Sequence, residues 1–162
     1  MDLKLIKKSI LKIDEFQFKC SIGTKGIKKN KNEGDSCTPI GKYKLKNLFY
    51  RNDRMKNFNC KLNTIIIKKN MGWCDDPKSK YYNCLVQNKK KIKCEELYRK
   101  DHLYDFLIEI DYNNKKIPFV GSAIFIHLTN NYKPTRGCIA LKEKDFRVLL
   151  KLIKKGSYID IS

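Results

Sequence analysis

The chain has 162 residues, 41% of them hydrophobic, which suits one domain over residues 1–162 and excludes a disordered chain. No apolar run approaches the roughly 18 residues of a transmembrane helix, so we expect no transmembrane segment. The 36 basic residues exceed the 17 acidic ones by 19, but only five are arginine, and we interpret the charge as a solvated lysine surface.

The first predicted element follows a charged N-terminal stretch, MDLKLIKKSILKIDEF. Charge interrupts this stretch every two or three residues, so it lacks the apolar region of a secretory signal and the sequence predicts none. Residues 15–22 then alternate, with Phe16 and Phe18 on one side, which predicts a strand. The polar segment 23–39 is long for a connection, and such loops are often functional.

The middle of the chain predicts three further strands. Residues 62–68, with TIII at the centre, indicate a buried strand, and the segment 72–83 after it predicts a loop. Residues 105–112 alternate apolar and polar side chains, which predicts a strand with one solvated face. Residues 122–128 place Ala123, Phe125 and His127 on one face of a strand and Ile124, Ile126 and Leu128 on the other.

One strong helix is predicted, over residues 142–155, because Phe146, Leu149, Leu150 and Ile153 recur at helical spacing. Gly156 follows it as a typical helix terminator. A weaker helix is predicted over 95–100, and a short strand over 157–161 ends the chain. The sum is a mainly β protein of mostly antiparallel strands with one late helix.

Seven cysteines and two histidines give little indication of a metal site. There is no CxxC pair, and Cys74, Cys84 and Cys94 recur every ten residues, which is wide for a zinc site. We expect no metal and no cofactor. Scattered cysteines without a pairing pattern suit a reducing compartment.

One group of residues is a candidate catalytic site: His127 at a strand end, then Gly137 and Cys138 after a loop. A thiol nucleophile needs a base for its proton, and it needs backbone amides aimed at the oxyanion, which a preceding glycine exposes. On the pattern alone, the opposite interpretation stays open. A cysteine on a buried strand is usually an inert small apolar residue.

The stretch GSAIFIHLTNNYKPTRGCIALKEKDF, residues 121–146, resembles the catalytic motif of the L,D-transpeptidase (YkuD-like) family. That motif runs from a histidine on a strand to Ser/Thr-x-Gly-Cys and an apolar strand. The segments EGDSCTPIGKYKL, GWCDDP, YYNCLV and DHLYDFLIEIDY resemble the small single-domain bacterial branch of the family. The resemblance therefore covers nearly the whole chain.

The resemblance implies a β-sandwich or β-barrel fold around the catalytic cysteine, and acyl transfer on peptidoglycan stem peptides or muropeptides. By position, Cys138 is the nucleophile and His127 the general base. Gly137 and Cys138 supply the oxyanion-hole amides, and Thr135 stands at the Ser/Thr position. It also implies inhibition by β-lactams of the carbapenem class.

Two departures from the family pattern concern substrate binding. Arg136 stands where many members have histidine, and Ala140 stands where many have arginine or asparagine. An arginine cannot act as a base, but it can pair with a substrate carboxylate. The donor, the acceptor and the choice between transfer and hydrolysis by an L,D-carboxypeptidase stay open on the sequence.

Other candidates each have two interpretations. Trp73 lines a substrate groove or packs in the core, and His102 is a second active-site histidine or a structural one. Asp75 and Asp76 bind a substrate amine or cap a loop. An inactive basic module that binds an anionic polymer is a remote alternative. The lack of a leader predicts a cytoplasmic protein, whereas the family function predicts the periplasm or cell wall.

Overall fold

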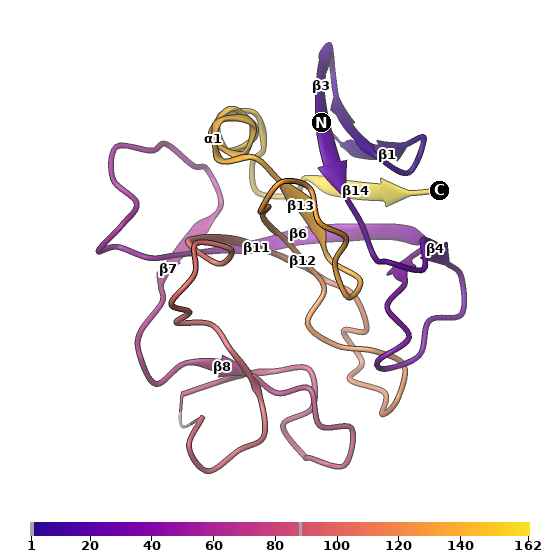
Figure 1. Cartoon of the computed structure of the whole chain (residues 1–162), viewed down its shortest axis with the longest axis vertical. Coiled ribbons are helices and arrows are strands. Elements are labelled where there is room, and N and C mark those ends of the chain that lie inside the picture. Colours follow the sequence, from indigo (N-terminus) through magenta and orange to yellow (C-terminus); the bar gives the residue numbers. More distant parts are fainter. Residues whose placement is uncertain (1, 88) are drawn as a thin grey trace.

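The computed structural model describes residues 2–87 and 89–162 and shows a mainly β protein (Figure 1). One sheet runs in the order β11 (Phe106–Ile110), β12 (Phe125–Leu128), β13 (Ile139–Leu141), β3 (Phe16–Ser21), β2 (Ile10–Ile13), β1 (Leu3–Ile6), β14 (Tyr158–Ile161), β6 (Gly41–Tyr50) and β7 (Asn63–Ile66). Strand β11 pairs with β6 as well as with β12, so the order closes on itself as in a barrel. The expected mainly β fold is confirmed, and most pairings are antiparallel.

Three pairings in this sheet are parallel. Strand β1 pairs with β14, β6 pairs with β7, and β12 pairs with β13. The first brings the two ends of the chain together in the middle of the sheet (Figure 1). The third places the two segments that carry His127 and Cys138 side by side.

The helix α1 spans Glu143–Leu152 and confirms the predicted late helix. It ends earlier than expected, since its C-cap is Ile153, whereas Gly156 lies in the following turn. The buried face presents Phe146, whose ring stacks on Phe106 of β11 at 5.4 Å between centroids. The helix therefore covers the face of the sheet opposite to the cysteine site.

Two clusters of buried side chains lie on the two faces of β11 and β12. Ile124, Ile126 and Leu128 belong to the larger cluster with the helix, whereas Ala123 and Phe125 belong to the smaller one. The predicted alternation of this strand is confirmed. Cys138 belongs to the smaller cluster, so the candidate nucleophile packs on the same face as Phe125.

The smaller cluster is closed by the segment between β7 and β11. It contains a second sheet in the order β10 (Glu95–Glu96), β8 (Gly72–Trp73) and β9 (Leu85–Val86). The weak helix predicted over 95–100 is wrong, because Glu95 and Glu96 pair as a strand with β8. This cover also makes the predicted solvated face of β11 wrong: all five of its residues are buried.

Two other expectations need correction. Strand β7 exists, but it lies at the sheet edge and is not buried as a whole; Ile66 is 44% exposed. The 23–39 segment is not all loop, since β4 (Ile27–Lys28) and β5 (Thr38–Pro39) pair within it. This pairing folds the segment back toward the cysteine site.

Candidate active site

The parallel pairing of β12 and β13 brings His127 and Cys138 together. His127 is the register partner of Ala140, and Cys138 lies two residues before Ala140. Because side chains two apart on an extended chain share a face, Cys138 points to the side of the sheet that carries His127. Both side chains line one cavity of about 710 Å³.

The thiol of Cys138 is held between two backbone groups of the neighbouring segment. Its Sγ donates to the carbonyl of Ala123 at 3.2 Å and accepts from the amide of Phe125 at 3.4 Å. The residue is 8% exposed, and burial raises its pKa to about 12, with the charge of Glu95 acting in the same direction. The resting group is therefore a neutral thiol.

The imidazole of His127 is fixed by its own backbone. Its Nδ1 lies 2.7 Å from the carbonyl oxygen of Leu128, and a carbonyl only accepts, so Nδ1 carries the proton. This leaves Nε2 as the basic nitrogen. Burial lowers the pKa of His127 to about 4, so the ring is neutral at pH 7. The ring of Tyr104 packs edge-on against it at 5.2 Å between centroids.

The turn before Cys138 is built around Gly137. Its φ is +139°, and a Cβ there would lie 2.7 Å from the carbonyl oxygen of Cys37. Only glycine fits this close approach. The Gly137 carbonyl accepts from the hydroxyl of the fully buried Thr38 at 2.8 Å, and the same hydroxyl accepts from the amide of Gly23 at 2.9 Å. The turn is therefore tied to the 23–39 segment.

The Thr135 side chain forms two hydrogen bonds within this turn. Its hydroxyl donates to the carbonyl of Cys138 at 2.6 Å and accepts from the amide of Gly137 at 3.1 Å. The Gly137 amide thus has a partner in the resting state. Its expected role in an oxyanion hole requires that this hydrogen bond be shared or released when the oxyanion forms.

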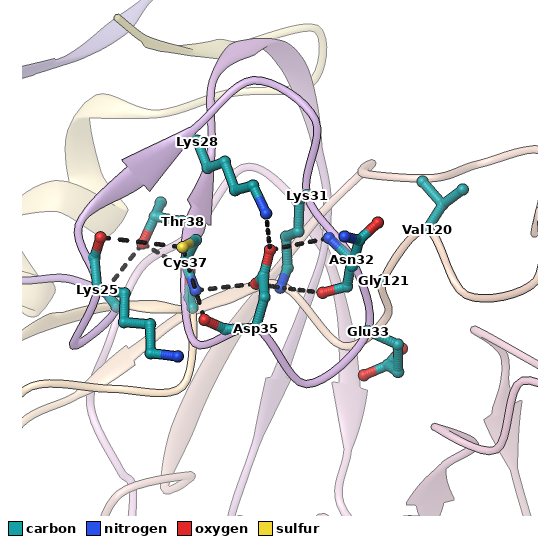
Figure 2. Close-up of polar contacts among 12 residues, drawn as sticks. Lys25, Lys28, Lys31, Asn32, Glu33, Asp35, Cys37, Thr38, Val120 and Gly121 are labelled. Atoms are coloured by element: carbon teal, nitrogen blue, oxygen red, sulfur yellow. Dashed lines mark hydrogen bonds and ion pairs between the residues drawn. The ribbon is translucent and has the colours of Figure 1, made fainter.

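The 23–39 segment keeps its shape through Asp35 (Figure 2). Burial opposes ionisation of this carboxyl, but hydrogen bonds from the Lys31 ammonium and the amides of Asn32 and Cys37 hold its pKa at about 2. Lys28 lies 3.6 Å from the same carboxylate. This arrangement fixes Cys37 against Gly137 and leaves Lys31 in the cavity wall.

The cavity wall contains some of the predicted binding residues. Arg136 and Thr135 line it, and Arg136 is exposed on the surface beside the cavity mouth. Lys133 adds further positive charge to the same wall, whereas Lys31 and Arg99, which also line it, are paired with Asp35 and Asp101. These groups suit a substrate that carries carboxylates.

His102 and Trp73 lie outside that wall. His102 is exposed, with Nε2 3.1 Å from the carbonyl oxygen of Thr129. Trp73 is 6% exposed and packs edge-on against Phe125 at 5.1 Å between centroids. The packing interpretation of Trp73 therefore fits its position, and a role in substrate binding stays a prediction for both residues.

Hydrogen bonds nonetheless link Trp73 to the Cys138 thiol through Asn83. The sequence analysis did not identify Asn83 as a residue of the site. The indole N–H of Trp73 and the amide of Ala123 both donate to Asn83 Oδ1, at 2.9 and 3.1 Å. Ala123 has φ +53°, an unusual value for alanine, and its carbonyl accepts from the Cys138 thiol. Asn83 thus positions the backbone that holds the nucleophile. The sequence predicted a loop that ends at Asn83 and a family resemblance over YYNCLV, but neither assigned a role to Asn83 itself.

Glu95 is the other residue that the sequence did not single out. It lines the cavity, and Tyr104 donates a short hydrogen bond to its carboxylate. Burial raises the pKa of Glu95. The false prediction of a helix over 95–100 concealed it, because that helix would have made Glu95 an ordinary surface residue.

The described residues, 2–87 and 89–162, contain no group of three histidine, cysteine or carboxylate side chains that could hold a metal ion. In the same part of the chain, no helix is long and apolar enough to cross a membrane.

The order of these elements, with a histidine strand, a glycine–cysteine turn and a short strand, is also that of a known family. The family model of the L,D-transpeptidase catalytic domain, YkuD, matches residues 11–161. The chain belongs to the YkuD family. The match begins in β2, ends in β14 and contains both His127 and Cys138, which confirms the resemblance seen in the sequence. No curated protein and no solved structure matches this YkuD domain.

Proposed function

We propose that this YkuD domain is an L,D-transpeptidase that transfers acyl groups of peptidoglycan stem peptides through a thioester on Cys138. The observation that carries the proposal is the shared cavity, in which the buried thiol and the basic Nε2 of His127 lie on adjacent strands. Membership of an enzyme family that acts on peptidoglycan peptides supports the substrate class.

The two shifted pKa values define how acylation starts. With a thiol pKa of about 12 and an imidazole pKa of about 4, a thiolate–imidazolium pair is not the resting state. The proton therefore moves from Sγ to Nε2 as the sulfur attacks the carbonyl carbon of the donor. The Phe125 amide, 3.4 Å from Sγ, stabilises the negative charge that develops on the sulfur.

The protonated His127 then returns its proton to the leaving amine. The hydrogen bond from Nδ1 to the Leu128 carbonyl keeps Nε2 in place during both transfers. The oxyanion needs amide donors, for which Gly137 and Cys138 are the candidates by position. Arg136 at the cavity mouth supplies a charge for the carboxylate of the donor peptide.

The test is an assay of D-alanine release from a tetrapeptide donor, with intact mass measurement of the enzyme. The parent should form an acyl adduct on Cys138, and Cys138→Ala should release no D-alanine. Cys84→Ala, at a half-exposed thiol outside the cavity wall, is the control and should keep the parent activity. Equal release by Cys138→Ala and the parent would refute the proposal.

A further inference from the structure

The acylation step proposed above uses none of the acidic residues that line the cavity, among them Asp75 and Glu95. In the second sheet, Glu95 is the register partner of Trp73. Asp75 lies two residues after Trp73, so its side chain returns to the same face of the chain. Asp75 and Glu95 both line the cavity of Cys138, and the negative charge of Asp75 adds to the rise in the Glu95 pKa.

One oxygen of the partly buried Asp75 carboxylate lacks a hydrogen-bond partner among the described residues. This oxygen, Oδ1, is shielded from solvent. Buried polar atoms without a partner are rare in folded proteins, because each costs about 1–3 kcal/mol. Lysines are abundant in this chain, yet none forms an ion pair with Asp75 within residues 2–87 and 89–162. The residue that carries this unpartnered oxygen also lines the cavity of Cys138.

Glu95 lines the same cavity as the reacting sulfur. Its charge contributes to the raised pKa of Cys138 and of Tyr104, so a negative charge here disfavours the thiolate. A carboxylate in this place therefore hinders the first half of the reaction. It is useful only if a later step brings a positive charge or a transferable proton to the same spot.

The acceptor of a transpeptidase provides both, because a primary amine is protonated at pH 7 and must lose a proton before it can attack. We propose that Asp75 and Glu95 bind the ammonium group of the amine acceptor and that Glu95 removes its proton. This inference rests on the proposed function and assigns the acceptor side of the same cavity. It makes an amine, rather than water, the group that resolves the thioester.

The step balances without a further reactant. The ammonium gives one proton to the Glu95 carboxylate, and the free amine attacks the thioester carbonyl. The C–N bond forms, the C–S bond breaks, and the sulfur leaves as a thiolate. The neutral His127 takes the second proton of the amine and returns it to that thiolate, and the proton on Glu95 passes to solvent. Burial raises the pKa of Glu95, which improves its match to an amine.

The experiment separates the two halves of the reaction. A tetrapeptide donor is incubated with increasing D-methionine as acceptor, and mass spectrometry measures the exchange product and the hydrolysis product. Acylation alone is measured with a carbapenem, which needs no acceptor, by intact mass. Glu95→Gln is compared with Glu96→Gln, its neighbour, which is exposed and paired with Lys89 on the surface.

Glu95→Gln should lower the maximal rate of exchange by about 100-fold, the usual contribution of a positioned base. Its acylation by the carbapenem should be unchanged or faster, because one negative charge near the thiol is gone. Glu96→Gln should behave as the parent does in both assays. If Glu95→Gln lowers the exchange rate, relative to the parent, by no more than it lowers the acylation rate, the inference is overturned.

Asp75→Asn tests the binding role independently, and it decides the matter if Glu95→Gln does not fold. It should raise the D-methionine concentration for half-maximal exchange by about tenfold, as expected for about 1.4 kcal/mol of binding energy, with little change in the maximal rate. Asp76→Asn, whose carboxylate accepts from the Lys78 amide in a turn, is its control. An unchanged acceptor requirement in Asp75→Asn would count against the site.

The outcomes for the parent separate this inference from the proposed function. A parent that acylates on Cys138 but only hydrolyses the donor overturns the acceptor site and leaves the thioester chemistry standing. A parent that is acylated by neither the peptide nor the carbapenem overturns the proposed function itself.

Discussion

The buried imidazole of His127 should make the protein lose stability as the pH falls. The folded pKa is about 4, whereas the ordinary value is 6.5, so between these values the unfolded chain binds a proton that the folded chain does not. Stability from this group is therefore complete above pH 6.5 and is lost as the pH falls toward 4. The full loss is about 3 kcal/mol at 1.36 kcal/mol per pKa unit.

His127→Asn isolates this effect, because the asparagine amide can replace the Nδ1–H donor to the Leu128 carbonyl but does not titrate. Between pH 7 and pH 4.5 the parent should lose about 2 kcal/mol that the variant keeps, measured as the free energy of unfolding in urea. His102→Asn, at the exposed histidine, should lose as much as the parent. Equal pH dependence in the parent and in His127→Asn would refute the assignment of the buried neutral ring. The lowered pKa of His127 also sets the acidic limb of the pH profile, because the protonated ring cannot act as the base. Activity should therefore fall near pH 4, whereas an unperturbed imidazole would cause this loss in the neutral range.

Three further predictions concern the nucleophile and its turn. A carbapenem should add once, at Cys138. Iodoacetamide should instead label the half-exposed Cys84 before it labels Cys138, because burial keeps Cys138 a neutral thiol. Intact mass measurement and peptide mapping check the number and the order of these additions. Arg136→Ala should slow carbapenem acylation by about tenfold without changing the labelled residue, since it removes a charge for the β-lactam carboxylate. Gly137→Ala should destabilise the fold by at least about 2 kcal/mol in urea unfolding and abolish acylation, whereas Gly26→Ala, with positive φ but open space, carries only the conformational cost.

The strands around the site were predictable because their patterns are strong and local. The segment 122–128 alternates apolar residues on both faces, and the helix that contains Phe146 has a clear helical spacing. The β1–β2 hairpin was not predictable in this way. Its turn residues Lys7 and Lys8 take left-handed φ values of +51° and +57°, positions that glycine or asparagine normally marks.

The site was predictable only in part. His127 and Cys138 follow from the family motif, whereas Glu95 and Asn83 come from a segment whose structure depends on long-range pairing. The ten-residue cysteine spacing had a simple cause that only the pairing reveals. Cys74 directly follows β8, whereas Cys84 and Cys94 directly precede β9 and β10. Because both of these strands pair with β8 in antiparallel orientation, the spacing of the cysteines reflects the register of the pairings.

The link between the 23–39 segment and the nucleophile can be tested at one hydroxyl. Thr38→Val keeps the shape of the side chain but removes the group that bonds the Gly23 amide and the Gly137 carbonyl, both buried. Leaving two buried polar groups without partners should cost about 2–4 kcal/mol in urea unfolding. Because Gly137 precedes Cys138, carbapenem acylation should also slow, even under conditions where the variant is fully folded. Thr24→Val is the matched control, since its hydroxyl bonds the Thr135 carbonyl at an exposed position and should cost under about 1 kcal/mol. A Thr38→Val variant that unfolds like the Thr24→Val control and acylates like the parent would show that the turn holds the nucleophile without this tether.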